Sequence, residues 1–263
     1  MSAPQLMGVV NVTPDSFSDG GLYLDPEAAI AHGRELVEAG AEILDVGGES
    51  TRPGAEPVGV GEELERVVPV IRGLSGSRTR VSIDTSKAAV AAAALDAGAE
   101  IVNDVTALRG DSEMGGLCAE RGATVVLMHM LGEPRTMQED PRYDDVVADV
   151  KAFLAERLEA AIGAGIEEER VWLDPGIGFG KTGAHNMELL RRLGELRELG
   201  RPLVIGTSRK SFIGKVDGSP ADERLGGSIA SSILAAAEGA DVLRVHDVAE
   251  MRQALTVATA ILG

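Results

Sequence analysis

The chain has 263 residues, of which 44% are apolar and 25% are charged, and 42 acidic against 25 basic side chains give a formal net charge of −17. This length and composition allow one large α/β domain with a sizeable core, whereas the negative charge disfavours nucleic acid as a partner. The single cysteine, Cys118, excludes a disulfide framework and a cysteine-based metal site. We see no secretory signal or membrane-spanning run, so we expect a cytoplasmic protein.

Short apolar strands alternate with amphipathic helices along the chain. The expected strands are 6–10, the apolar part of 38–46, 80–84, the apolar part of 96–105, 124–128, 171–174, 203–206 and the apolar part of 238–248. The expected helices are 26–39, 62–72, 87–97, 113–121, 143–164, 185–199, 221–238 and 249–262. Continuous apolar strands in such alternation favour a parallel sheet covered by helices.

Three segments, 38–46, 96–105 and 238–248, repeat one pattern of helix end, glycine, apolar strand and polar residue. Their glycines, Gly40, Gly98 and Gly239, fall where helices end with a glycine cap. Eight strand–helix units in 263 residues predict a single (β/α)8 TIM barrel over residues 1–263. A doubly wound open sheet is the alternative fold.

Polar residues gather at the C-terminal ends of the expected strands, the face that carries catalytic residues in a barrel. They are Asn11, Asp45, Asp84, Asn103, His129, Asp174, Ser208 to Lys210, Arg244 and His246. Any one Asp or Asn could simply cap a helix or end a strand. Caps explain one polar residue per loop, but not a set that includes two basic clusters, so we expect a binding site on this face.

The segment DPGIGFGKTG (174–183) has the look of a phosphate-binding loop. A Walker A loop would need glycine where Pro175 stands, and a dinucleotide fingerprint would follow the first strand, whereas this segment follows the sixth. We therefore reject both nucleotide-binding interpretations. Asp174 at the strand end could instead accept two parallel N–H groups from an amino-heterocycle.

Two further loops are long and rich in glycine, proline and hydroxyl residues: NVTPDSFSDGG (11–21) and GGESTRPGAEPVG (47–59). Loops of this length in a barrel are either disordered or functional. We interpret them as flexible lids that close around a ligand, because glycine frees the backbone and binding residues favour loops on rigid scaffolds.

Taken together, these motifs resemble the dihydropteroate synthase family. The resemblance is carried by MGVVNVTPDSFSDGG (7–21), DVGGESTRPGA (45–55), SIDTSK (82–87), NDV (103–105), LMHM (127–130), LDPGIGFGK (173–181), GTSRKSFIG (206–214) and RVHDV (244–248). It implies a (β/α)8 barrel, usually a homodimer, that is the target of sulfonamides. In folate biosynthesis, such an enzyme joins p-aminobenzoate to 6-hydroxymethyl-7,8-dihydropterin pyrophosphate with Mg²⁺ and yields 7,8-dihydropteroate and pyrophosphate.

The resemblance also implies roles for individual residues. The pterin would be bound by Asp84, Asn103, Val105, Met128, Asp174, Gly206, Lys210 and Arg244. The pyrophosphate would be bound by Asn11, Thr51, Arg244 and His246, with Asn11 also meeting the magnesium ion. The p-aminobenzoate would be bound by Phe17, Thr51, Arg52, Pro53, Phe179, Lys210 and Ser211. Asp84, Lys210 and Arg52 are the expected catalytic residues, Asp84 because a buried carboxylate stabilises a cation at the pterin methylene.

Other residues are expected outside the chemistry. We expect His129 to be structural or to support the site, His32 and His185 to lie at the surface, and Cys118 to be buried and inert. We expect segment 215–228 to lie away from the pockets, against the outer helices. Three other functions stay open: a methyltetrahydrofolate-binding methyltransferase, a catalytically silent pterin-binding paralogue, and a structural barrel.

Overall fold

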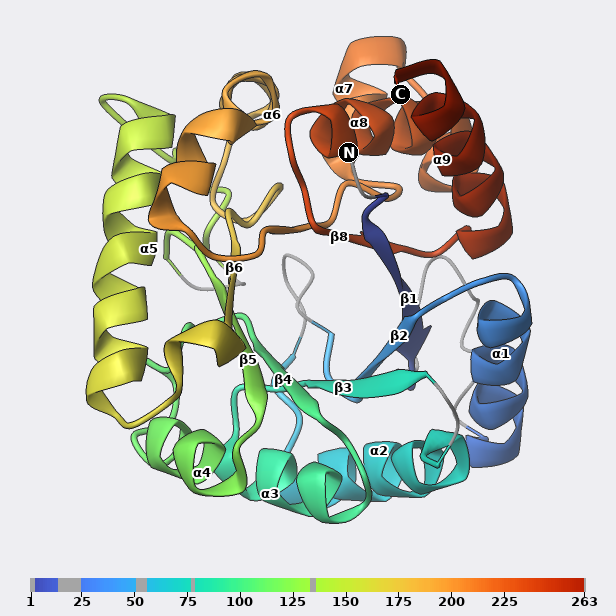
Figure 1. The fold of residues 1–263 in the computed structure, drawn as a ribbon, viewed down its shortest axis with the longest axis vertical. Coiled ribbons are helices and arrows are strands. Elements are labelled where there is room, and N and C mark those ends of the chain that lie inside the picture. The colour runs from blue at the N-terminus through green and yellow to red at the C-terminus, as the bar shows by residue number, and fades with distance from the viewer. Residues whose placement is uncertain (1–2, 14–24, 51–55, 77–78, 133–135, 263) are drawn as a thin grey trace.

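The computed structural model describes residues 3–13, 25–50, 56–76, 79–132 and 136–262. Within them, eight parallel strands form one sheet that curls into a barrel, with helices around its outside (Figure 1). The strands are β1 Gln5–Asn11, β2 Ile43–Gly47, β3 Arg80–Asp84, β4 Ile101–Asp104, β5 Thr124–Met128, β6 Val171–Asp174, β7 Val204–Ile205 and β8 Val242–Val245. The predicted strands and the (β/α)8 fold are confirmed.

The sheet order is β6-β5-β4-β3-β2-β1-β8-β7, so β6 and β7 are its two edges. These edges meet through a parallel bridge between Leu173 and Leu203, and the Leu173 amide donates to the carbonyl oxygen of Pro202 at 2.9 Å. The barrel is therefore nearly closed, which rules out the open doubly wound sheet.

The helices are α1 Pro26–Glu38, α2 Val60–Leu74, α3 Ala88–Asp96, α4 Met114–Arg121, α5 Val146–Gly163, α6 Gly183–Arg191, α7 Ser211–Asp217, α8 Leu225–Ala237 and α9 Val248–Leu262. Gly40, Gly98 and Gly239 follow helix ends with φ of +106°, +109° and +98°, as the repeated pattern predicts. No helix in the described ranges is long and apolar enough to cross a membrane.

Two helical segments differ from the predictions. The helix predicted over 185–199 stops at Arg191, and a 3-10 helix, Leu193–Leu199, continues with buried Leu193 and Leu196 three residues apart, the repeat of a 3-10 turn. Helix α7 is not predicted, because seven residues that include Gly214 are too few to show a helical period.

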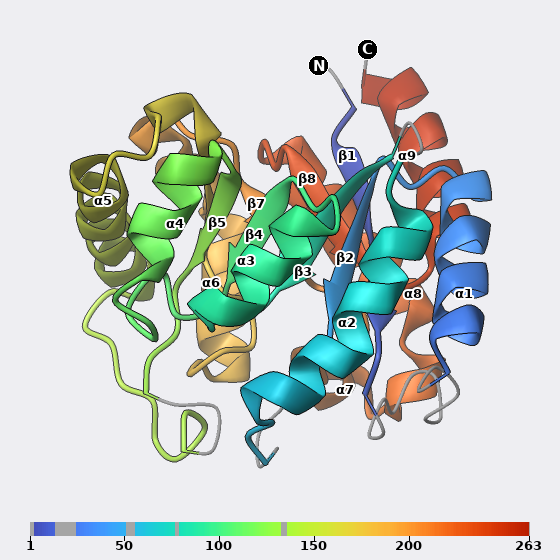
Figure 2. The same cartoon turned by 90° about the horizontal axis from the view of Figure 1, so that it is seen from below.

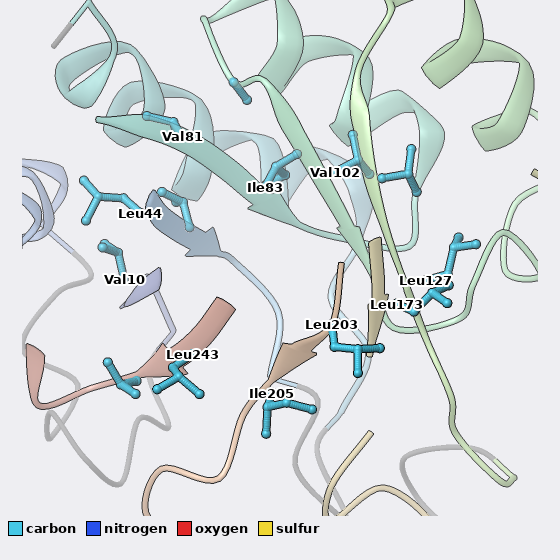
Figure 3. Packing of buried hydrophobic residues seen from close by; sticks show 14 of the residues in the cluster. Val10, Leu44, Val81, Ile83, Val102, Leu127, Leu173, Leu203, Ile205 and Leu243 are labelled. Carbon is cyan, nitrogen blue, oxygen red and sulfur yellow. The ribbon is translucent and has the colours of Figure 1, made fainter. Parts of the chain in front are cut away.

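The strands alternate between two cores. Outward side chains such as Leu44, Ile83 and Leu127 pack under the surrounding helices (Figure 3). Inward side chains form a separate apolar cluster within the barrel, made of Met7, Ile43, Ile101, Val126, Trp172, Val204 and Val242. Because every second residue of a strand faces the same way, the residue two positions beyond each of these also points inward.

On four of these seven strands the next inward residue is polar, whereas β1, β5 and β7 carry Val9, Met128 and Gly206 there. Asp45 follows Ile43, Asn103 follows Ile101, Asp174 follows Trp172, and Arg244 follows Val242, each by two residues. The apolar cluster therefore forms a floor, with charged and amide groups above it at the C-terminal strand ends. In the side view, α7 lies at this end of the barrel, opposite the start of β1 (Figure 2).

Candidate active site

A cavity of about 550 Å³ opens at the C-terminal ends of the strands. Three of the residues expected to bind pterin, Asp84, Lys210 and Arg244, line it. It is also lined by Asn11, Thr13, Glu49, Ser50, Gly178, Phe179, Ser208, Ser211 and His246. The structure thus brings residues from opposite ends of the sequence to one mouth.

Arg244 connects two carboxylates, Asp45 and Asp84, by hydrogen bonds at the cavity; we call these three residues the Arg244 centre. Its Nε donates to Asp45 Oδ2 at 2.6 Å, and its Nη2 donates to Asp84 Oδ2 at 2.8 Å. Burial raises the pKa of Asp84 to about 7, Arg244 opposes the shift, and the carboxylates of Asp45, Glu63 and Asp104 add to it. Asp84 is therefore a carboxylate that titrates near neutral pH.

The charges of Asp174 and Lys210 interact with each other next to this centre. Asp174 Oδ1 accepts from the Gly176 amide at 2.7 Å, and burial raises the pKa of Asp174 while Lys210 opposes that shift. Lys210 Nζ donates to the Ile177 carbonyl and lies 4.3 Å from the ring centroid of Phe179. Burial lowers the pKa of Lys210 to about 8, although Asp174 opposes this.

The other expected pterin residues surround the cavity without lining it. Asn103 Nδ2 donates to Asp45 Oδ2 at 3.1 Å, which joins it to the Arg244 centre. Val105 and Met128 belong to a small apolar cluster with Met130 and Met137, and Phe179 packs against that cluster. Gly206 follows β7 beside Arg244, where a Cβ would come within 3.8 Å of the Arg244 Cβ.

Of the residues expected to hold pyrophosphate, three line the cavity and the fourth, Thr51, lies outside the described residues. Asn11 and His246 both line the cavity, and His246 Nδ1 lies 3.0 Å from Ser208 Oγ. The neighbouring Arg209 has a φ of +57°, and its amide donates to Ser228 Oγ at 2.8 Å. This uncommon backbone conformation lets Ser208 and Lys210, on either side of it, both reach the cavity.

Four expected residues, Phe17, Thr51, Arg52 and Pro53, lie outside the described residues. The described ends of their loops do reach the cavity, through Thr13 on one loop and Glu49 and Ser50 on the other. Glu49 also closes the base of the second loop, because it accepts from the Val58 amide at 2.8 Å and from Lys87 Nζ at 2.6 Å.

The glycine-rich segment after β6 is a packing device. Gly176, Gly178 and Gly180 have φ of +66°, +86° and +60°. A Cβ at Gly176 would collide with the His129 carbonyl oxygen, and one at Gly180 with that of Leu131. The glycines therefore let this segment lie directly on the loop that follows β5.

Lys181 fastens this segment, and sequence reasoning missed it. Its side chain is only 1% exposed. Nζ lies 2.8 Å from His129 Nδ1 and donates to the carbonyls of Gly176 and Phe179 at 3.0 Å each. Lys181 stands in the Gly-Lys pair and at the end of the LDPGIGFGK motif, but neither pattern indicates a buried lysine that binds backbone carbonyls.

The structure also shows where the remaining histidines and the single cysteine lie. His129 is structural, as expected: burial lowers its pKa to about 3, and Lys181 adds to the shift. His32 and His185 are partly exposed, in line with the expected surface positions. The His185 ring accepts from the Thr182 amide at 3.3 Å in the N-terminal cap of α6. Cys118 is buried in α4, where burial raises its pKa to about 12 and keeps it inert.

We expect Lys181→Met to lower the free energy of unfolding by about 1–3 kcal/mol, because the buried carbonyls lose their donor. We also expect the pKa of His129 to rise, since the charge of Lys181 adds to its lowering, even though burial lowers the pKa of Lys181 as well. Urea unfolding and NMR titration measure the two effects. Lys151→Met is the matched control, since Lys151 pairs with Glu198 at the surface. A Lys181→Met protein as stable as wild type contradicts the fastening role.

The cavity also extends beyond its expected limits. Lys215, Ala221 and Arg224 line it, so the expectation that segment 215–228 lies away from the pockets is wrong. The chain after α7 turns back toward the site, where Arg224 donates to the carbonyls of Arg209 and Ser219, both at 3.1 Å.

The comparisons with known proteins agree with this site. Residues 7–246 match the family described as pterin binding enzyme. The chain is 48% identical to the dihydropteroate synthase of Escherichia coli K12, over 100% of this chain and 93% of that protein. Against the Yersinia pestis enzyme, solved with a sulfonamide drug complex, the TM-score is 0.96 at 45% identity, covering 99% of this chain and 95% of that one.

A dihydropteroate synthase of Xanthomonas albilineans, solved with 4-aminobenzoic acid, gives a TM-score of 0.93 at 51% identity, covering 100% of this chain and 94% of that one. Fold, site and family match define a barrel enzyme of the pterin-binding class. Within that class, the chain belongs to the dihydropteroate synthase family. The enzyme class and function expected from the sequence are thereby confirmed.

Proposed function

We propose that the enzyme condenses 6-hydroxymethyl-7,8-dihydropterin pyrophosphate with p-aminobenzoate in the described cavity, using the residues expected from the sequence. The observation that carries this proposal is Arg244 held between Asp45 and Asp84, with Lys210 and His246 on the same cavity. A homologous Xanthomonas albilineans enzyme, 48% identical with a TM-score of 0.89, has been solved in complex with 7,8-dihydropteroate.

The pterin is oriented by its polar edge. The 2-amino group and the adjacent N3–H form two parallel donors, which the Asp174 carboxylate accepts. One of its oxygens already accepts from Gly176 but has a second lone pair free to accept. Asn103 lies beside this edge, and Lys210 donates to the pterin carbonyl and ring nitrogen. The flat Arg244 guanidinium stacks on the ring.

The pyrophosphate and its magnesium ion would bind beside Asn11 and His246, which both line the cavity. No cluster of three or more metal-binding side chains occurs within the described ranges. Mg²⁺ keeps several waters and takes few protein oxygens, and Asn11 would supply an amide oxygen. When bound, Mg²⁺ neutralises charge on the departing pyrophosphate. Arg244, His246 and Thr51 hold the same group.

The reaction exchanges one bond for another at the pterin methylene. The C–O bond to pyrophosphate breaks, its electron pair leaves with the pyrophosphate, and the methylene gains cationic character. The Asp84 carboxylate stabilises that charge. The aniline nitrogen then forms the C–N bond and loses a proton. Phe179, Lys210 and Ser211 hold p-aminobenzoate, together with Phe17, Thr51, Arg52 and Pro53.

We also propose that the chain works as a homodimer. Exposed apolar side chains occur on α7, α8 and α9: Val216, Leu225, Leu234, Val257 and Ile261. Helices α8 and α9, which carry four of these side chains, pack against each other. Apolar side chains gathered on one surface are typical of subunit contacts. The cytosolic location and the assignment of residues 1–263 to one domain stay predictions.

The test is pyrophosphate release by the purified protein given the pterin substrate and Mg²⁺, with and without p-aminobenzoate. We expect release that requires p-aminobenzoate, is blocked by a sulfonamide, and falls when EDTA removes the metal. Tight pterin binding by calorimetry without any release favours the silent paralogue. If neither is found, the methyltetrahydrofolate-binding methyltransferase is the function to test next.

A further inference from the structure

Asp45 does not line the cavity but contacts Arg244, which does. It points into the barrel from β2, and its side chain is 0% exposed. A single oxygen, Oδ2, accepts from Arg244 Nε at 2.6 Å and from Asn103 Nδ2 at 3.1 Å. One carboxylate oxygen therefore contacts two of the residues to which we assign pterin binding.

The contact with Arg244 fixes the plane of the guanidinium. Asp45 takes the Nε side, and Asp84, on the neighbouring strand β3, takes Nη2 at 2.8 Å. A guanidinium held by one carboxylate through one nitrogen can still turn about that contact. Two carboxylates on adjacent strands remove this freedom, because each binds a different nitrogen of the planar group.

The contact with Asn103 fixes the direction of an amide. A carboxylate oxygen only accepts hydrogen bonds, so the group that faces Asp45 is the Asn103 NH₂. The amide oxygen is then on the other side of the group. Asp45 thus decides which end of Asn103 offers an acceptor and which a donor.

Stability does not explain this arrangement well. Asp45 Oδ1 is buried without a hydrogen-bond partner among the described residues, and so is the hydroxyl of Ser82, its register neighbour on β3. Burying a charged carboxylate with one oxygen unpaired costs free energy. Such costs typically occur where a residue serves a functional site.

We propose that Asp45 is a positioning residue of the pterin site, which sets the plane of Arg244 and the direction of the Asn103 amide without touching the substrate. The proposal rests on the function proposed above and names a further residue that this function needs.

The test is Asp45→Asn, which keeps the size of the side chain but removes its charge. Hydrogen bonds that orient binding residues are worth about 10- to 100-fold in activity where they support metal ligands. We expect the same order of loss in kcat/KM for the pterin substrate, with KM for p-aminobenzoate changed by less than about twofold. Calorimetry with 6-hydroxymethylpterin should show weaker binding in parallel.

Ser82→Ala is the matched control. It removes a buried polar atom from the adjacent strand at the same level of the barrel, without touching Arg244 or Asn103. We expect its activity and pterin affinity to equal those of the wild type. Circular dichroism and thermal unfolding of both variants confirm that each is folded before the rates are compared.

The pH profile gives a signature that loss of packing alone does not produce. The charged groups that act on Asp84 are Arg244 on β8, Asp45 on β2, Glu63 on α2, Asp104 on β4, and Lys210 just before α7. Removing the Asp45 charge takes away a repulsion on Asp84 and leaves Asp84 as the one carboxylate hydrogen-bonded to Arg244 among the described residues. Both changes favour the Asp84 carboxylate, so the acid limb of kcat/KM should move to lower pH in Asp45→Asn.

Each outcome bears on one proposal. If wild type makes dihydropteroate and Asp45→Asn keeps the same pterin affinity and acid limb, the positioning role is refuted. If wild type makes no product, the proposed function fails, and the pterin affinities of the two proteins still decide the role of Asp45. An equal loss of kcat/KM in Asp45→Asn and Ser82→Ala also refutes the positioning role. The effect would then come from any change to the packing at this level of the barrel.

Discussion

Asp84→Asn should lower kcat by about 100- to 1,000-fold, the loss seen when one preorganised electrostatic group is removed from a site where charge develops. The asparagine amide keeps the shape of the side chain but cannot stabilise a cation at the pterin methylene. Arg244 keeps its contact with Asp45 at 2.6 Å, so we expect the fold to survive. Steady-state rates of dihydropteroate formation measure the effect.

The pH dependence of kcat/KM provides a second test of the role of Asp84. Only the charged form of Asp84 acts in this role, and its pKa is raised to about 7 by burial. In the wild type, kcat/KM should therefore fall as the pH falls through about 7, because this parameter reports groups of the free enzyme. Asp84→Asn should lose that acid limb, since no group at this position can titrate.

Asp96→Asn is the control for this experiment, because Asp96 pairs with Arg121 at the surface at 2.7 Å. We expect it to change kcat by less than about twofold, as surface pairs contribute little. An Asp84→Asn enzyme with the wild-type rate, or with the wild-type acid limb, would falsify the role of Asp84.

Lys210→Ala should lower kcat/KM by about 100-fold or more, because a charged donor to a buried ligand is lost together with its contact to p-aminobenzoate. Lys210 lies between the two proposed substrate sites: it interacts with the charges of Asp174 and Asp84 and lies over the Phe179 ring. The loss should therefore be visible with either substrate varied. Lys151→Ala, at a surface pair with Glu198, is the matched control.

We expect the loss of the Lys210 charge to produce the alkaline limb of the pH dependence of kcat/KM. Burial lowers its pKa to about 8, so the ammonium loses its proton as the pH rises through about 8. With Asp84 on the acid side, kcat/KM should be bell-shaped with its maximum between about pH 7 and 8. The two limbs belong to a coupled set of charges, yet Lys210→Ala should remove only the alkaline one. Normal activity in this variant is incompatible with the proposed site.

Much of the fold could be predicted because its signals are local. The bounds of β3, β5 and β6 match the predicted ones, since each strand is a short apolar run between turn residues. The glycines after α1, α3 and α8 could be predicted because a helix end needs a left-handed residue at one known position. Polar residues two positions beyond the apolar floor could be located by the same two-residue period.

The sequence by itself also determined which side chains could form the site, because strand ends in a barrel share one face. Asp84, Lys210 and Arg244 do line one cavity there. The sequence by itself could not determine which of these charged side chains pair with each other. Arg244 lies 199 residues from Asp45 and 160 from Asp84, and no local pattern encodes which carboxylate meets which nitrogen.

The tertiary structure alone decided what depends on contact between distant segments. Lys181 is a buried fastener because the loops after β5 and β6 lie against each other, backbone to backbone. Segment 215–228 reaches the cavity because Arg224 draws it back to Arg209. Periodicity and turn chemistry act over a few residues, whereas charge pairing and loop packing are set only when the closed barrel brings its strand ends together.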